Sequence, residues 1–187
     1  MQQPKLFMLL LGCKPAGRNT EQHDMFFGIA DSLKELIPQI ENFWPGSGKI
    51  HIDGWKEVNY VDGHSIKIIP HSTEPLTNRV KLFFLNLGGY KENEFEEFHY
   101  KMLAVAAGKA EAIQKAKQTA FYKHTGFKGA DSHIDDKYGV DVDDIYEIED
   151  ILPAALKDQF SIQIERLTTD TPTEDELQLG YFKLSTL

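Results

Sequence analysis

Two nearly continuous apolar runs, residues 6–11 and 82–87, stand near the start and the middle of the chain. Each run ends at a glycine, Gly12 in the first case and Gly88 in the second. An uninterrupted apolar run of this length is typical of a central β-strand that is buried on both faces. The pattern therefore predicts one buried strand in each half of the chain.

A longer segment with helical spacing follows each run. Apolar residues recur every three or four positions over residues 26–40 and again over residues 95–120. This spacing predicts a helix in each half, and Asn19 or Thr20 is placed to cap the first one. Two shorter strand-like segments then follow each helix, at 49–53, 65–69, 133–135 and 145–151.

The two halves also match each other in sequence. Lys5–Gly12 agrees with Lys81–Gly88 at six of eight positions, 76 residues further along the chain. A second block sets His51–Asp53 against His133–Asp135, 82 residues further along. Both blocks keep their order, which indicates an internal duplication.

These elements predict an α+β fold of two tandem β-α-β-β repeats packed with approximate two-fold symmetry. We expect the helices on one face of an antiparallel or mixed sheet, because each helix has one apolar stripe to bury. The repeats cover residues 1–75 and 76–152, and residues 153–187 form an extension that we expect to add a pair of strands. Since no long linker separates the repeats, one compact unit is expected.

Composition narrows the classes of partner. The 187 residues include 29 acidic and 20 basic side chains, which give a net charge of −9. Such a surface repels phosphate groups, so nucleic acids and anionic membranes are excluded as expected partners. The chain has one cysteine, Cys13, and its apolar N-terminal run is too short to span a bilayer. We therefore expect a protein of a reducing, bacterial cytoplasm.

Histidine and acidic residues recur at the matched positions of the two halves. One histidine and one glutamate stand near each predicted helix start, and one histidine and one aspartate stand two apart on a predicted strand, where they share a face. Two imidazoles and a carboxylate can hold a divalent metal and leave coordination positions open. The candidate metal ligands are Glu21, His23, His51, Asp53, Glu97, His99, His133 and Asp135.

The same residues also allow two other interpretations. A histidine with an aspartate can act as an acid–base pair, which makes His23, Asp53, His99 and Asp135 the candidate catalytic residues. A histidine that hydrogen-bonds a strand aspartate can instead be a structural tie, which a duplicated fold would repeat. All three interpretations remain open at this point.

Arg18 and Asn19 are weaker candidates for binding a ligand. They lie in a glycine-containing segment between a predicted strand and helix, where an anion could bind. The segment lacks the glycine and lysine spacing of a nucleotide-binding loop, so nucleotide binding is not predicted.

The runs at residues 5–12, 17–24, 133–137 and 145–150 together resemble a bacterial domain-of-unknown-function family numbered 1543. That family occurs in one or two copies per protein, and the resemblance extends over residues 5–152. It implies a small bacterial cytosolic protein and supplies no activity. The second half departs from the 17–24 run and keeps only the glutamate and the histidine.

Two classes of function follow from these patterns. The first is a binding or assembly module that contacts another protein or a second copy of itself. The second is a metal-dependent or His–Asp hydrolase-like enzyme. The first predicts that His51 and Asp53 lie apart from His23, whereas the second predicts that these side chains converge.

Overall fold

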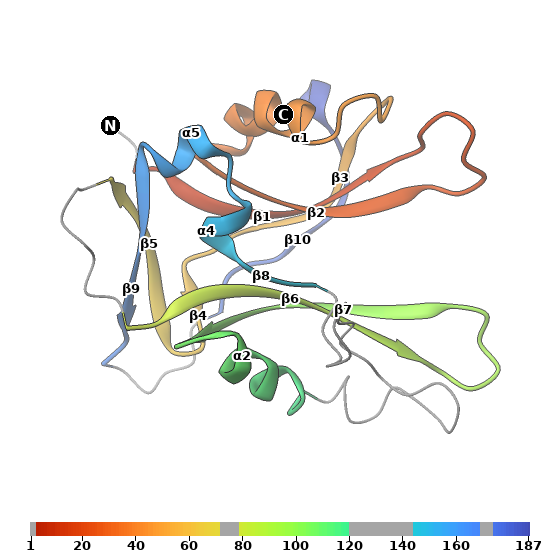
Figure 1. Cartoon of the computed structure of the whole chain (residues 1–187). Helices are drawn as coiled ribbons and strands as arrows, with labels where there is room; N and C mark the ends of the chain where they lie inside the picture. The colour runs from red at the N-terminus through yellow and green to blue at the C-terminus, as the bar shows by residue number, and fades with distance from the viewer. Residues whose placement is uncertain (1–2, 72–78, 120–143, 169–173) are drawn as a thin grey trace. The chain divides into compact units, whose positions relative to one another are not determined.

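The computed structural model describes residues 3–71, 79–119, 144–168 and 174–187 (Figure 1). It contains both helices and antiparallel β-sheets, so the predicted α+β class is confirmed. Within the described parts of the chain, no helix has the length and apolar character needed to cross a membrane.

The chain divides into two compact units. The first unit consists of Met1–Leu76 and Leu152–Leu187, and the second consists of Thr77–Ile151. The C-terminal segment thus folds together with the first part of the chain.

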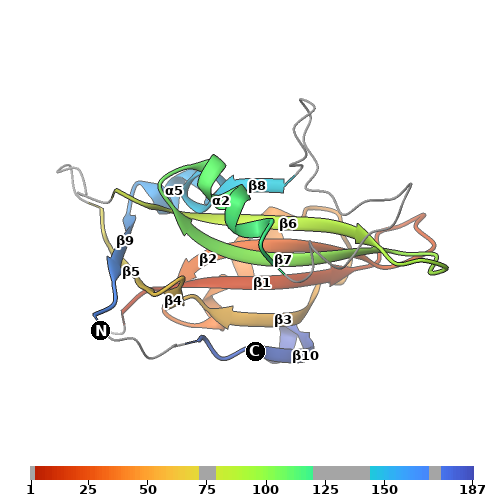
Figure 2. The same ribbon diagram turned by 90° about the horizontal axis from the view of Figure 1, so that it is seen from below.

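The main sheet of the first unit contains four antiparallel strands in the order β10-β3-β1-β2 (Figure 2). Its strands are β1 (Lys5–Cys13), β2 (Gln22–Ala30), β3 (His51–Glu57) and β10 (Gln178–Lys183). The strand β1 is central, as its apolar run predicts.

A short helical segment packs over one face of this sheet (Figure 1). It consists of a 3-10 turn, η1 (Leu33–Leu36), followed by α1 (Ile37–Phe43). Leu36 and Ile40 are fully buried in one cluster with Leu9 and Leu11 of β1. Because side chains alternate along a strand, the residues of β1 between these leucines belong to the other face.

A smaller sheet of the first unit has the strand order β4-β5-β9. Its strands are β4 (Tyr60–Val61), β5 (His64–Pro70) and β9 (Phe160–Arg166). A short helix, α5 (Ala154–Lys157), precedes β9, and a 3-10 turn, η2 (Leu184–Thr186), follows β10.

The second unit contains a three-stranded antiparallel sheet in the order β7-β6-β8. Its strands are β6 (Lys81–Tyr90), β7 (Glu97–Ala106) and β8 (Asp144–Glu147), and its helices are α2 (Lys109–Ala116) and α4 (Ile148–Ile151). Leu85 and Leu87 of β6 are buried in one cluster with Ala112 and Ala116 of α2. The strand β6 is therefore central, again as predicted.

The predicted β-α-β-β order within each unit is wrong. A second strand, β2 or β7, directly follows the first, and the helix comes after it. Phe26 and Ile29 are spaced as on a helix, but Phe26–Ile29 is a continuous buried segment. Four consecutive buried residues fit a strand covered on both faces, and pairing with β1 along its whole length outweighs the helical spacing.

The prediction that the C-terminal extension adds two strands needs a similar correction. Both β9 and β10 are present, but they do not form a pair: β9 lies beside β5 and β10 lies beside β3. The two strands extend different sheets of the first unit.

The alignment of the second sequence block is also wrong where its residues are described. It matches Asp62 with Asp144 and Ile66 with Ile148. Asp62 has a positive φ of 50° in the turn between β4 and β5, whereas Asp144 begins β8. Ile66 lies on β5, whereas Ile148 begins α4, so these residues are not equivalent.

Candidate functional site

The candidate functional site surrounds Gly12, near the end of the central strand β1. Gly12 lies opposite His23 of β2 on one side and opposite His51 of β3 on the other. Residues opposite each other in antiparallel strands project from the same face of the sheet. Two imidazoles therefore flank a residue without a side chain, on the face that turns away from α1.

Two carboxylates complete the cluster. Glu21 lies two residues before His23 and projects to the same face. The pairing of β3 with β1 shifts between Leu10 and Leu11, which leaves Asp53 as an extra residue at a β-bulge. A bulge redirects the side chain that it carries.

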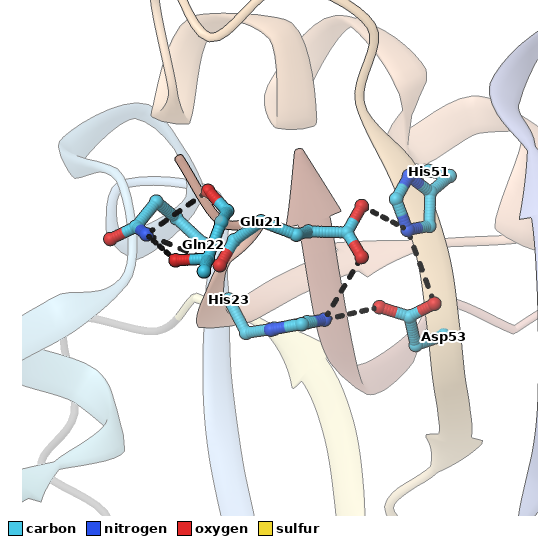
Figure 3. A network of polar contacts seen from close by, with 6 residues as sticks. Glu21, Gln22, His23, His51 and Asp53 are labelled. Carbon is cyan, nitrogen blue, oxygen red and sulfur yellow. Dashed lines mark hydrogen bonds and ion pairs between the residues drawn. The ribbon is translucent and has the colours of Figure 1, made fainter. Parts of the chain in front are cut away.

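The ends of these four side chains converge (Figure 3). Nε2 of His23 lies 3.1 Å from Oδ2 of Asp53 and 3.8 Å from Oε2 of Glu21. Nε2 of His51 lies 3.2 Å from Oδ1 of Asp53 and 3.3 Å from Oε1 of Glu21. Each carboxylate thus contacts both imidazoles. We call these four residues the His–carboxylate cluster.

The cluster has a buried side and a solvent side. The side chain of His51 is 4% exposed and that of Asp53 is 26% exposed, whereas His23 and Glu21 are 43% and 44% exposed. Nε2 of His51 and Oδ2 of Asp53 are buried and have no hydrogen-bond partner. Both atoms lie close to atoms of opposite character, but without the direction that a hydrogen bond requires.

Gly12 leaves the space in which the cluster forms. A Cβ atom at this position would lie 2.5 Å from Nε2 of His51 and 2.6 Å from Oδ2 of Asp53. Contacts this short do not occur between real Cβ atoms and their neighbours. Any other residue at position 12 would therefore displace the buried half of the cluster.

An aromatic ring from the C-terminal strand covers His51. The rings of His51 and Tyr181 are stacked, with centroids 4.1 Å apart and planes 29° apart. Tyr181 lies on β10, which is the neighbour of β3 in the main sheet. The C-terminal segment thus contributes directly to the surroundings of the cluster.

The arrangement can act chemically in two ways. The imidazoles and carboxylates can exchange protons, or all four groups can act as ligands of one cation, since each offers a nitrogen or oxygen lone pair. Among the residues that the structure describes, no group of three or more His, Cys, Asp and Glu side chains is arranged to hold a metal ion as the side chains stand.

The four candidate residues of the first half are thus brought together by the fold, but not from the elements that we predicted. His23 lies on strand β2 and not near the start of a helix. The amide groups of a helix N-terminus therefore do not contribute to this cluster, contrary to our expectation. The predicted catalytic and metal-binding roles of these residues stay predictions.

The corresponding residues of the second half are described only in part. Glu97 and His99 lie on β7, and His99 is opposite Gly88 of β6. His133 and Asp135, their expected partners, lie outside the described residues.

Arg18 and Asn19, the candidate ligand-binding residues, are exposed and lie between β1 and β2. Their predicted role in binding an anion stays a prediction.

Sequence reasoning did not identify Gly12 or Tyr181 as part of the site. Gly12 carried a signal, because it ends an apolar strand at a point where most residues would fit equally well. Tyr181 carried none, because its contact with His51 depends on which strand lies beside β3.

Cys13, the residue after Gly12, is buried on the other face of the sheet. Burial raises the pKa of the Cys13 thiol, and the Glu21 carboxylate raises it further. The thiol therefore stays protonated at neutral pH, which agrees with the interpretation of Cys13 as a small buried residue.

Comparison with known proteins supports the family resemblance seen in the sequence. Residues 18–68 match a family described as Domain of Unknown Function (DUF1543), and this segment includes all four residues of the cluster. The chain is also similar to the crystal structure of a protein Il1583 from Idiomarina loihiensis. The TM-score is 0.65 at 24% sequence identity, and the similarity covers 97% of each chain.

At that identity the second likeness shows the fold alone. No curated protein matches the chain. The comparisons therefore give this chain a known fold and a similarity to a family of unknown function, and they indicate no specific activity.

Proposed function

We propose that the first unit binds a divalent transition-metal cation at the His–carboxylate cluster, and that the protein is a metal-dependent enzyme. One observation carries this proposal. The buried Nε2 atom of His51 lies 3.2 and 3.3 Å from two carboxylate oxygens and is hydrogen-bonded to neither. Lone pairs that are directed at a common point, and not at one another, are what ligands of one ion share.

The distances between the donor atoms support this proposal. Metal bonds to nitrogen and oxygen of about 2.0–2.1 Å imply about 3.0–3.4 Å between neighbouring ligand atoms in octahedral or tetrahedral geometry. Three of the four nitrogen–oxygen distances, 3.1, 3.2 and 3.3 Å, lie in this range. The fourth, 3.8 Å, joins His23 to Glu21, whose side chains are the most exposed of the four. Rotation of these two side chains would complete the coordination sphere.

Charge also favours a cation over a structural tie. Two carboxylates beside two neutral imidazoles place two negative charges in a partly buried space, which is costly without a compensating cation. A hydrogen-bonded tie would satisfy Nε2 of His51 and Oδ2 of Asp53, but both atoms are unpaired. An unpaired buried polar atom costs about 1–3 kcal/mol, and a bound cation would remove this cost.

The ligand types indicate which cation to expect. Imidazole nitrogens prefer zinc, iron, cobalt, nickel or copper, whereas magnesium and calcium prefer sites made of oxygen atoms. The exposed side of the cluster, formed by His23 and Glu21, would leave the ion open to water and substrate. Metal ions in catalytic sites keep such a position, where a bound water becomes a nucleophile near neutral pH. Hydrolysis is therefore the reaction class that we propose.

Zinc binding measured by isothermal titration calorimetry tests the proposal. The full-length protein, freed of any histidine tag and stripped of metal, is titrated with Zn²⁺, with Mg²⁺ as a comparison. Replacing His23 with Ala or Glu21 with Gln should remove one zinc site per chain, or weaken it by more than about 100-fold, because loss of a ligand exceeds the 10–100-fold effect of losing an outer partner. Both residues are exposed, so neither change should disturb folding.

His64→Ala is the matched control, because His64 lies on β5 and bonds the backbone oxygen of Asp62. It should leave zinc binding unchanged. Equal binding by the wild type, His23→Ala and His64→Ala would refute the proposed metal site.

An internal duplication is the second part of the proposal, with repeats near residues 1–75 and 76–152. Side chains 76 residues apart make the same contacts in the two units. Gln39 donates to the backbone oxygen of Ile29, and Lys115 donates to that of Val105.

Two further contacts repeat in the same way. The Glu35 carboxylate accepts from the amide of Asp31, and that of Glu111 accepts from Ala107. Lys5 bonds Glu57 at 2.7 Å, and Lys81 bonds Glu147 at 2.7 Å. In both cases the lysine begins the central strand and the glutamate ends a neighbouring one.

A binding or assembly module is the alternative function. Leu177, Leu179 and Tyr181 are exposed apolar residues at alternate positions along β10, an edge strand of the main sheet. An exposed apolar row on an edge strand favours contact with another protein or with a second copy. Light scattering of the purified protein tests this alternative, which predicts a stable dimer or larger assembly. A bacterial cytoplasmic location without nucleic-acid partners is the setting that we propose for either function.

A further inference from the structure

We propose that Tyr181 is a positioning residue of the metal site, which holds the His51 imidazole in its ligand orientation. This inference rests on the proposed metal-binding function. Tyr181 is itself 64% exposed, yet its ring lies face to face on a buried imidazole at 4.1 Å. An aromatic side chain that remains exposed to solvent while covering a candidate ligand is not explained by burial of its own surface.

The backbone of β10 is shaped to bring this ring into place. The pairing of β10 with β3 shifts register between Leu179 and Phe182, so that Gly180 and Tyr181 form a bulge. Gly180 has a φ of +155°, and a Cβ atom there would lie 3.3 Å from the Phe182 ring. A glycine thus permits a local conformation that other residues would strain.

Two bulges therefore meet at the same point of β3. One separates β3 from regular pairing with β1 at Asp53, and the other separates β10 from regular pairing with β3 beside it. Bulges concentrate next to functional sites, where they redirect side chains. Here one directs a carboxylate into the cluster, and the other directs Tyr181 onto His51.

A stacked ring can act on a ligand in a way that first contacts cannot. His51 has few conformations available in its buried position, but the imidazole can still rotate about its last bond, which is a soft torsion. Stacking at 29° between planes opposes this rotation and keeps Nε2 directed at the carboxylates. The ring also excludes water from one face of His51, so that the imidazole is offered to the metal already ordered.

Zinc affinity and the NMR spectrum of His51 test this role together. In the metal-free protein, Tyr181→Ala should shift the carbon-bound ring protons of His51 downfield, because the ring current of the stacked phenol is lost. It should also weaken zinc binding by about 10-fold or more, as expected for a partner that orients a ligand. Tyr181→Phe keeps the ring and should restore both values to those of the wild type.

Leu179→Ala is the control, because Leu179 is exposed on the same strand and the same side and does not touch His51 through a ring stack. Circular dichroism verifies that each variant is folded. Wild-type zinc binding that is unaffected by Tyr181→Ala would overturn the role of Tyr181 and leave the metal site standing. Failure of the wild type itself to bind zinc would overturn the metal site, and the inference about Tyr181 with it.

Discussion

Gly12 lies directly opposite His51 across the β1–β3 pairing, and a side chain at Gly12 would meet Nε2 of His51 at 2.5 Å. The buried half of the candidate site therefore depends on an absence of side chain in the central strand. The neighbouring strands contribute one imidazole and one carboxylate each, on either side of this glycine. The sheet thus supplies both the ligands and the space between them.

Gly12→Ala should abolish zinc binding at the cluster, because the added methyl group occupies the position of the His51 and Asp53 donor atoms. The measurement is the zinc titration used for the wild type. Gly108→Ala is the matched control, since an added Cβ at Gly108 meets nothing within 4 Å and the φ of −174° suits any residue. Undiminished zinc binding by Gly12→Ala would mean that the ion binds elsewhere.

Leu9→Ala and Leu85→Ala should each lower the free energy of unfolding by about 2–5 kcal/mol. Both leucines are fully buried on the central strands β1 and β6, so that each change leaves a cavity. Denaturant unfolding with circular dichroism measures the loss. Leu179→Ala, at an exposed position, should change stability by less than about 0.5 kcal/mol. A nearly neutral Leu85→Ala would contradict the central place of β6.

Asp175→Ala should lower the free energy of unfolding by about 1.5–3 kcal/mol, which is the usual worth of hydrogen bonds to a charged group. The Asp175 carboxylate accepts hydrogen bonds from the amides of Asn59 and Tyr60 at 3.0–3.2 Å. It thereby anchors the segment before β10 to the chain between β3 and β4. Glu174→Ala, one residue earlier and exposed, is the control and should be nearly neutral.

The same change should act on the site at a distance. Since β10 carries Tyr181, loosening its anchor should reduce the stacking on His51 and weaken zinc binding in the same direction as Tyr181→Ala. Zinc affinity that stays unchanged in a destabilised Asp175→Ala protein would show that β10 is held in place by other contacts.

Cys13 should make stability depend on pH in alkaline solution. Burial raises the pKa of its thiol in the folded state, so above about pH 8.5 the unfolded chain loses this proton before the folded one does. The stabilising contribution is therefore complete below that pH and declines as the pH rises toward the folded-state pKa. Unfolding at several pH values, with Cys13→Ala as reference, measures this decline. A stability difference between the two proteins that does not change with pH would refute it.

The fold class and the two central strands could be predicted because they depend on local patterns. Continuous apolar runs that end at Gly12 and Gly88 suffice to indicate buried strands. The second strand of each unit could not be predicted in this way. The residues from Phe26 to Ile40 span a strand and a helix whose apolar positions happen to continue one helical spacing.

The candidate site could be predicted in its residues but not in its geometry. Sequence repetition drew attention to Glu21, His23, His51 and Asp53 before their neighbours were known. Their convergence depends on which strands lie on either side of β1 and on a bulge at Asp53, and neither is a local property of the sequence. The contact of Tyr181 depends on pairing between the two ends of the chain, which gives no sequence signal.

Anomalous X-ray diffraction from a crystal of the full-length protein soaked in Zn²⁺ tests the central claim most directly. We expect a peak at the His–carboxylate cluster, about 2.0–2.2 Å from Nε2 of both His23 and His51 and from at least one carboxylate oxygen. A zinc peak elsewhere in the crystal, with none between these two imidazoles, would contradict the proposed metal site.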